Sequence, residues 1–85
     1  MGKKQKLLKR LLAGSKNVAF ADVVSCIEAF GYRLDRINGS HHIFVHDKVP
    51  EVLNLQNVKG KAKPYQIKQF LQVIEAHDLR LEEDS

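Results

Sequence analysis

The chain contains little of what several classes of protein require. Its 85 residues include one cysteine, Cys26, and no tryptophan. A lone cysteine forms no disulfide within the chain, and no second cysteine is present to complete a cysteine zinc site. No apolar run approaches the ~20 residues of a membrane-spanning helix, and lysines interrupt the leucines near the N-terminus, unlike a secretory signal. We therefore expect a cytoplasmic protein with no cofactor and no membrane partner.

Basic residues are in excess, by 14 to 10 over acidic residues, for a net charge of +4. The excess is uneven, because five of the ten acidic side chains fall within residues 75–85. Residues 1–74 hold thirteen basic and five acidic residues and carry a net charge of +8. A field of this sign attracts phosphate groups. It suits an acidic protein surface equally well, so charge alone leaves both kinds of partner open.

Apolar side chains recur at helical spacing in three segments. These segments are residues 3–13, residues 22–30 and a stretch that begins at Pro64. Pro64 suits a first helical turn because its φ is already fixed near the helical value. Cys26 falls within the second helix, where we expect a small buried side chain. We also expect the leucine stripe of the first helix to pack on the domain, with its lysines solvated or extending a phosphate-binding surface.

The middle of the chain predicts three short strands joined by tight turns. Their ranges are 32–37, 40–46 and 51–56. Asn38-Gly39 predicts the first hairpin turn, because both residues tolerate positive φ. Residues 57–63 are expected to form a basic loop before the last helix.

The order of these elements predicts an α+β fold. Three antiparallel strands cannot bury a face alone, so the helices must cover one side of the sheet. The arrangement resembles the double-stranded-RNA-binding domain, αβββα, with an extra N-terminal helix. We expect a basic helix and connector at 1–19, the domain itself at 20–79, and an acidic tail at 80–85.

Two adjacent histidines, His41 and His42, follow a glycine and a serine at the start of the second strand. Histidine has the unperturbed pKa closest to neutral pH, so it can exchange protons under physiological conditions. Successive strand residues point to opposite faces. His41 therefore shares a face with Ile43 and Val45, and His42 shares the other with Phe44. Because Ile43 and Val45 are the more natural core pair, we expect His41 on the helix side and His42 on the open face.

Three interpretations of these histidines remain. They are hydrogen-bonded structural residues, catalytic acid/base groups, or metal ligands. His42 and His46 would share the open face, but no cysteine or well-placed carboxylate completes a set of metal ligands, so we expect no metal site.

A longer pattern surrounds the histidines. It consists of Gly31-Tyr32, Arg36, Gly39-Ser40-His41-His42-Ile43-Phe44, Val52-Leu53-Asn54-Leu55 and Lys63-Pro64. Together with the order of elements, this pattern resembles the HicA toxins of bacterial type II toxin–antitoxin systems over about residues 20–79. The resemblance implies the αβββα fold and a metal-independent endoribonuclease that cleaves mRNA and stops translation. It also implies a HicB-type antitoxin as the partner.

The resemblance places the family's catalytic histidine, which follows Gly-Ser, at His41. We expect His42 to assist or to bind substrate, and we expect phosphate contacts from Arg36, Lys59, Lys61 and Lys63. A histidine that acts as general acid or base contributes ~10²–10⁴-fold to a rate, and lysines can stabilise charge on the phosphate without a metal. Residues 1–19 and the lysine-rich loop 57–63 depart from the minimal family pattern.

Two other functions fit the same features. A non-catalytic RNA-binding module of this fold would use the same basic surface, and its RNA affinity would survive the loss of His41. A protein-interaction domain would present that surface to an acidic partner and would not bind RNA at physiological salt.

Overall fold

The computed structural model describes residues 3–14 and 17–81. In chain order the elements are α1 (Lys3–Leu12), α2 (Phe20–Ala29), β1 (Arg33–Asn38), β2 (His41–His46), β3 (Val49–Val58), β4 (Lys61–Ala62) and α3 (Pro64–Ala76). The strands form one antiparallel sheet in the order β1-β2-β3-β4. The expected α+β class is confirmed, with four strands in place of three. The expected acidic tail lies outside the described residues from position 82 onward.

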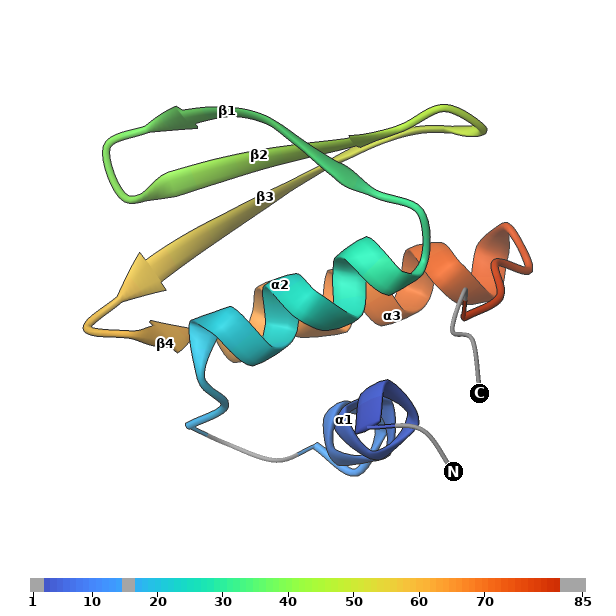
Figure 1. The fold of residues 1–85 in the computed structure, drawn as a ribbon, viewed down its shortest axis with the longest axis horizontal. Coiled ribbons are helices and arrows are strands. Elements are labelled where there is room, and N and C mark those ends of the chain that lie inside the picture. Colours follow the sequence, from blue (N-terminus) through green and yellow to red (C-terminus); the bar gives the residue numbers. More distant parts are fainter. Residues whose placement is uncertain (1–2, 15–16, 82–85) are drawn as a thin grey trace.

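The molecule is layered (Figure 1). Helices α2 and α3 lie side by side under one face of the sheet, and α1 crosses the helix layer on the side away from the sheet. Each helix buries one stripe of apolar side chains, as its sequence period predicts. Leu11 of α1 is only 4% exposed, so the N-terminal helix packs on the domain as expected, although Leu12 at its end is 62% exposed.

Backbone chemistry at the turns explains where the strands begin and end. The first hairpin turn is Gly39-Ser40, one residue later than expected, and Gly39 takes a φ of 64° there. The β3–β4 turn, Lys59-Gly60, has positive φ at both positions, 52° and 80°. That combination is typical of a hairpin turn that matches strand twist. The expected loop at 57–63 is therefore wrong, because β3 runs to Val58 and the chain returns as β4.

The faces of β2 are the reverse of the expectation from sequence. Phe44 is 1% exposed and belongs to the core with Leu53 and Leu55 of β3. His42 therefore points toward the helices, while His41 lies on the sheet face that no described helix covers. We call that surface the outer face. Phe44 is paired with Leu53 and His42 with Leu55. Because both leucines face the core, Phe44 and His42 face it as well.

The reversal has a physical reason. Burying an aromatic ring removes more apolar area from water than burying a valine or isoleucine. His42 and His46, which accompany Phe44 inward, are only half-buried and each bonds to a carbonyl, so no buried side-chain nitrogen of theirs is left unpaired. Cys26 is fully buried on α2, as expected, along with Val23 and Ile27.

Candidate functional site

Several turns and element ends meet at one end of the molecule, on the left in Figure 1. The Asn57 amide donates to the Ser40 carbonyl at 2.9 Å, which ties the β1–β2 turn to the end of β3. The Phe20 amide donates to the Gly60 carbonyl at 2.8 Å, which ties the start of α2 to the β3–β4 turn. We call this region the turn end. It gathers three regions of the chain, at the start of α2, in the β1–β2 turn and at the end of β3 with the turn that follows it.

His41 lies half-buried on the outer face at the turn end. Its Nδ1 is 3.0 Å from Oδ1 of Asn54, on the neighbouring strand β3. An amide oxygen only accepts hydrogen bonds, so Nδ1 of the neutral ring carries the proton and donates it. The other ring nitrogen, Nε2, is then the basic one. The arrangement leaves an oriented imidazole with a lone pair available for a proton.

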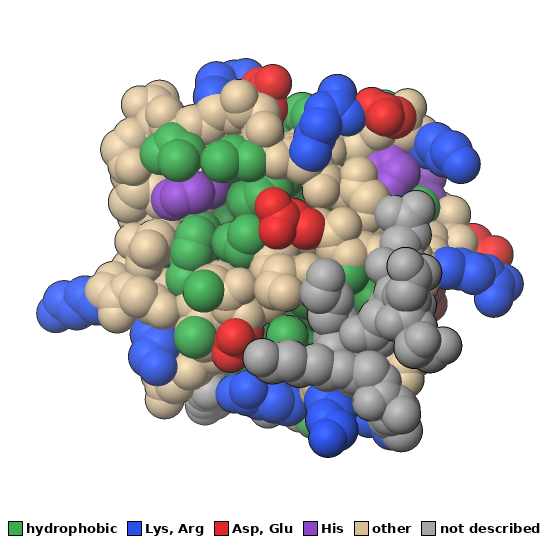
Figure 2. All heavy atoms as spheres, viewed as in Figure 1, with side chains coloured by type: hydrophobic (Ala, Val, Ile, Leu, Met, Phe, Trp, Pro, Cys, Tyr) green, Lys and Arg blue, Asp and Glu red, His purple; other side chains and the backbone are tan. Residues whose placement is uncertain are grey.

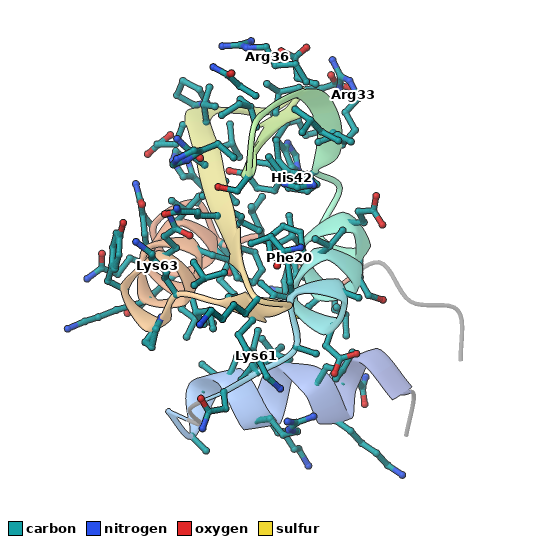
Figure 3. The ribbon with its side chains drawn as sticks, turned by 90° about the vertical axis from the view of Figure 1, so that its left-hand side faces the viewer. Phe20, Arg33, Arg36, His42, Lys61 and Lys63 are labelled. Atoms are coloured by element: carbon teal, nitrogen blue, oxygen red, sulfur yellow. The ribbon has the colours of Figure 1, made fainter. Side chains whose placement is uncertain are left out.

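His42 lies on the opposite face of β2, toward α2 (Figure 3). Its ring centroid is 4.7 Å from that of Phe20, with the two planes tilted by 58°. Its Nδ1 is 3.3 Å from the Ser40 carbonyl oxygen. The structure therefore separates the two adjacent histidines by the thickness of the strand, and only His41 shares a face with Arg36.

The expected phosphate-binding side chains fall into two groups. Figure 3 shows Arg36 on the outer side of the sheet, and Lys61 and Lys63 on the helix side. Arg36 is paired with Ile43, two residues along β2 from His41, and its guanidinium bonds to Asp35 at 2.6 Å. Lys59 is at the tip of the β3–β4 turn. The four cations thus border the turn end from both sides of the sheet.

This division is consistent with the wider distribution of charge. Figure 2 shows Lys and Arg side chains projecting around the whole outline of the molecule, with no single basic patch on the face in view. Arg33, also on the outer side, pairs with Asp47, which lowers the pKa of that carboxyl group through a hydrogen bond and its positive charge.

Sequence reasoning missed two residues at the turn end. Asn54 is the polar member between two inward leucines, and that alternation could have placed it on the outer face. Its contact with His41 follows only from the observed faces of β2. Phe20 begins α2 and places its ring against His42.

The remaining histidines have structural partners. His46 donates from Nε2 to the Phe30 carbonyl at 2.9 Å, and its Nδ1 accepts from the Lys48 amide at 3.0 Å. Both ring nitrogens are therefore occupied. Within the described residues, no group of three or more histidine, cysteine or acidic side chains is arranged to hold a metal ion.

His77, at the C-terminal end of α3, pairs with Glu51 of β3. Its Nε2 is 2.8 Å from a Glu51 carboxylate oxygen, and this hydrogen bond is the main reason that the pKa of Glu51 is lowered. The neighbouring Tyr32 hydroxyl donates to the Glu51 carbonyl at 3.2 Å. Burial, and secondarily the Glu51 charge, raises the pKa of Tyr32.

The fold and the turn end define a class: an α+β domain of the double-stranded-RNA-binding type that carries an oriented histidine with cations around it. The sequence model of the family described as HicA toxin of bacterial toxin-antitoxin matches residues 20–76. The chain belongs to this family. It is thus a toxin of a bacterial toxin–antitoxin system, which implies a cognate antitoxin as its partner. Searches among curated proteins and among solved structures gave no match.

Helix α1 lies outside the segment that matches the family. In the part of the chain that the structure describes, every helix is too short or too polar to cross a bilayer.

Proposed function

We propose that this chain is a metal-independent endoribonuclease that cleaves mRNA, with His41 as the catalytic acid/base residue. The observation that carries the proposal is the contact between His41 Nδ1 and Asn54 Oδ1. It orients the ring and leaves Nε2 as a proton acceptor on an accessible surface. This combination of a base and an orienting group recurs wherever a histidine activates a hydroxyl.

RNA brings its own nucleophile, the 2′-hydroxyl. His41 Nε2 takes the proton from this group, and the 2′-oxygen forms a bond to the adjacent phosphorus. The bond from phosphorus to the 5′-oxygen breaks, and that oxygen takes a proton from water. The products are a 2′,3′-cyclic phosphate and a free 5′-hydroxyl. We assign the terminal proton donor to water because His42, the nearest second histidine in sequence, faces the other side of the strand.

Cations hold the substrate in this proposal. Arg36 shares the outer face with His41, and cross-strand diagonal neighbours are about 7–8 Å apart, close enough for both to reach one phosphodiester. Lys59, Lys61 and Lys63 would bind phosphates further along the strand, around the turn end. Positive charge near a phosphorane stabilises the negative charge that develops there.

The partners follow from the same proposal. The substrate is mRNA, and the antitoxin is of the HicB type and prevents cleavage. We propose residues 20–79 as the unit that carries the activity, with the basic segment 1–19 and the acidic tail 80–85 as additions to it.

The test uses purified chain freed of its antitoxin, incubated with mRNA in the presence of EDTA. We expect wild-type protein to cleave and His41→Ala to cleave ~10²–10⁴-fold more slowly. His77→Ala is the matched control, because it removes a histidine at the far end of α3. Replacing the 2′-hydroxyls of a short RNA with hydrogen should abolish cleavage by every variant.

Other outcomes identify the rival functions. If His41→Ala cleaves RNA at the wild-type rate, the catalytic assignment is wrong. If neither protein cleaves but both bind RNA with equal, salt-sensitive affinity, the chain is a non-catalytic RNA-binding module.

A further inference from the structure

A groove lies between α2 and β1, the edge strand of the sheet. Its volume is about 370 Å³, within the range of small-molecule sites. The side chains that form its walls and floor are Phe20, Val24, Leu34, Ile37, His42 and Phe44. Figure 2 shows this feature as hydrophobic side chains gathered around a histidine, with an acidic side chain beside them.

The two walls of the groove differ in origin. Phe20 and Val24 come from α2, while Leu34 and Ile37 come from β1, the edge strand. Leu34 is 43% exposed and Ile37 is 56% exposed, although both occupy the helix-facing side of their strand. The edge strand therefore extends beyond the helix that should cover it, and a flat apolar space remains between them.

Polar groups lie at the rim of this space. They are the Ser25 hydroxyl, the Glu28 carboxylate and the His42 ring. Within the described residues, Ser25 and Glu28 have no side-chain hydrogen bond or ion pair. Because His42 Nδ1 lies against the Ser40 carbonyl and donates to it, Nε2 is left as an acceptor. The rim thus presents mainly acceptors.

Charge selects among the ligands that could enter. The lining contains one acidic residue, Glu28, and no lysine or arginine, so a phosphate or a carboxylate would be repelled. A flat, neutral group with N–H donors on its edge would satisfy the apolar walls and the acceptors together. Unpaired nucleobases have that character, since every base has a stacking face and most present N–H groups.

We propose that this groove binds one unpaired base of the RNA substrate, and that it prefers guanine. The inference rests on the proposed function, because it treats RNA as the ligand. Guanine presents two neighbouring donors on its Watson–Crick edge, N1–H and the N2 amino group. The two oxygens of the Glu28 carboxylate can accept both, and the base packs between the His42 ring and the exposed side chains of Leu34 and Ile37.

The position of the groove supports this assignment. His42 directly follows His41 in the chain, so the groove and the proposed catalytic nitrogen flank the same end of β2. The Phe20 amide bonds to Gly60, which brings the Lys59-Gly60 turn to the α2 end of the groove. A strand that places a base in the groove therefore has cations at hand for its phosphates.

The test measures binding without cleavage. The probes are hexamers of 2′-O-methyl RNA, which offer no free 2′-hydroxyl, with one guanine or one inosine in a uridine background. Inosine lacks the N2 amino group of guanine. We expect wild-type chain to bind the guanine probe about tenfold or more tightly than the inosine probe, as measured by fluorescence anisotropy.

Three variants locate the effect. Glu28→Gln should lose most of this preference, and Val24→Phe, which fills the groove, should lose it together with about 5- to 150-fold in affinity for the guanine probe. Glu75→Gln, an exposed substitution on α3, is the matched control and should behave as wild type. Glu28 is exposed, so its substitution tests the site even if Val24→Phe fails to fold.

The outcomes separate this inference from the function on which it rests. Equal binding of both probes by wild type and Glu28→Gln, with RNA cleavage intact, overturns the subsite and leaves the function standing. A guanine preference that depends on Glu28 supports the subsite even if cleavage is absent. If the variants leave RNA binding unchanged but weaken binding of the cognate antitoxin, the groove is an antitoxin interface and the proposal is wrong.

Discussion

At the scale of single residues, the proposed chemistry depends on how an amide holds an imidazole. The side-chain amide of Asn54 does not ionise near neutral pH, and in the proposed mechanism it contacts His41 and not the phosphate, so Asn54 is a positioning residue. Its Oδ1 fixes which nitrogen of His41 is protonated and which way the ring faces. Small displacements of a catalytic group cost as much as ~10²-fold in rate.

Replacing Asn54 with Ala should therefore lower kcat by about ten- to a hundredfold and leave KM for a short RNA unchanged. Val52→Ala is the control, because Val52 is an exposed residue of the same strand and the same face. Steady-state kinetics on a fluorogenic oligonucleotide would measure both constants. A rise in KM with unchanged kcat would show that Asn54 binds substrate and does not position His41.

Glu51 and His77 make a residue-scale prediction about acid stability. Because the folded pKa of Glu51 lies below its usual value of 4.5, the unfolded chain binds the proton more readily. The contribution to stability is therefore present above pH 4.5 and is lost as the pH falls through the lowered folded pKa.

Urea unfolding between pH 2 and pH 6 would measure this effect. We expect wild type to be more stable than Glu51→Gln at the upper end of that range and the two curves to converge at the acidic end. A constant difference at all pH values would mean that the ionised carboxylate is not what stabilises the native state.

At the scale of elements, strand β2 determines which histidine is accessible. Phe44 is 1% exposed, and the residues on either side of it face outward. Truncating a buried phenylalanine removes its transfer free energy and leaves a cavity, at a cost of about 3–5 kcal/mol.

Phe44→Ala should therefore lower the free energy of unfolding by about that amount, whereas Val45→Ala, on the outer face, should cost less than 1.5 kcal/mol, roughly what a partly buried truncation costs. Chemical denaturation followed by circular dichroism would measure both. If Val45→Ala proved the more damaging, the faces of β2 would be those expected from the alternation alone, and His42 would be the accessible histidine.

At the scale of the whole molecule, binding of a polyanion should follow the number of cations that it neutralises. The net charge of +8 over residues 1–74 provides attraction from a distance. Each phosphate contact on single-stranded RNA contributes about 0.7 to the slope of log affinity against log salt. Lys59 projects from a turn and has a φ of 52°, a conformation that asparagine adopts more readily than lysine.

Lys59→Asn should therefore reduce the salt slope by about 0.7 without destabilising the fold. Lys48→Asn, in the β2–β3 turn at the opposite end of the sheet, removes the same charge away from the turn end and should leave the slope unchanged. RNA affinity measured across a salt series would give the slope for each variant, and thermal unfolding would check that the fold is not destabilised. Equal slopes for both variants and wild type would place the RNA elsewhere on the surface.

The sequence by itself determined the elements and their order. Apolar spacing, Pro64 and the glycine-containing turns are local signals, and they fixed three helices and an antiparallel sheet to within a few residues. The histidine motif and its flanking pattern also identified the family. The β3–β4 turn at Lys59-Gly60 was missed because lysine rarely adopts positive φ, so no local signal indicated β4.

Only the tertiary structure decided which way the strand faces and what lies beside each histidine. Alternation along β2 shows that its side chains divide between two faces, but it does not show which face is buried. The buried face was decided by Leu53 and Leu55, which pair with β2, and by the carbonyl and aromatic partners of its histidines. The strand pairs and the contacts of His42 with Phe20 and of His46 with Phe30 join residues nine or more positions apart, so no local pattern contains them. The same is true of the Asn54 contact and of the groove, which exists because β1 reaches past α2.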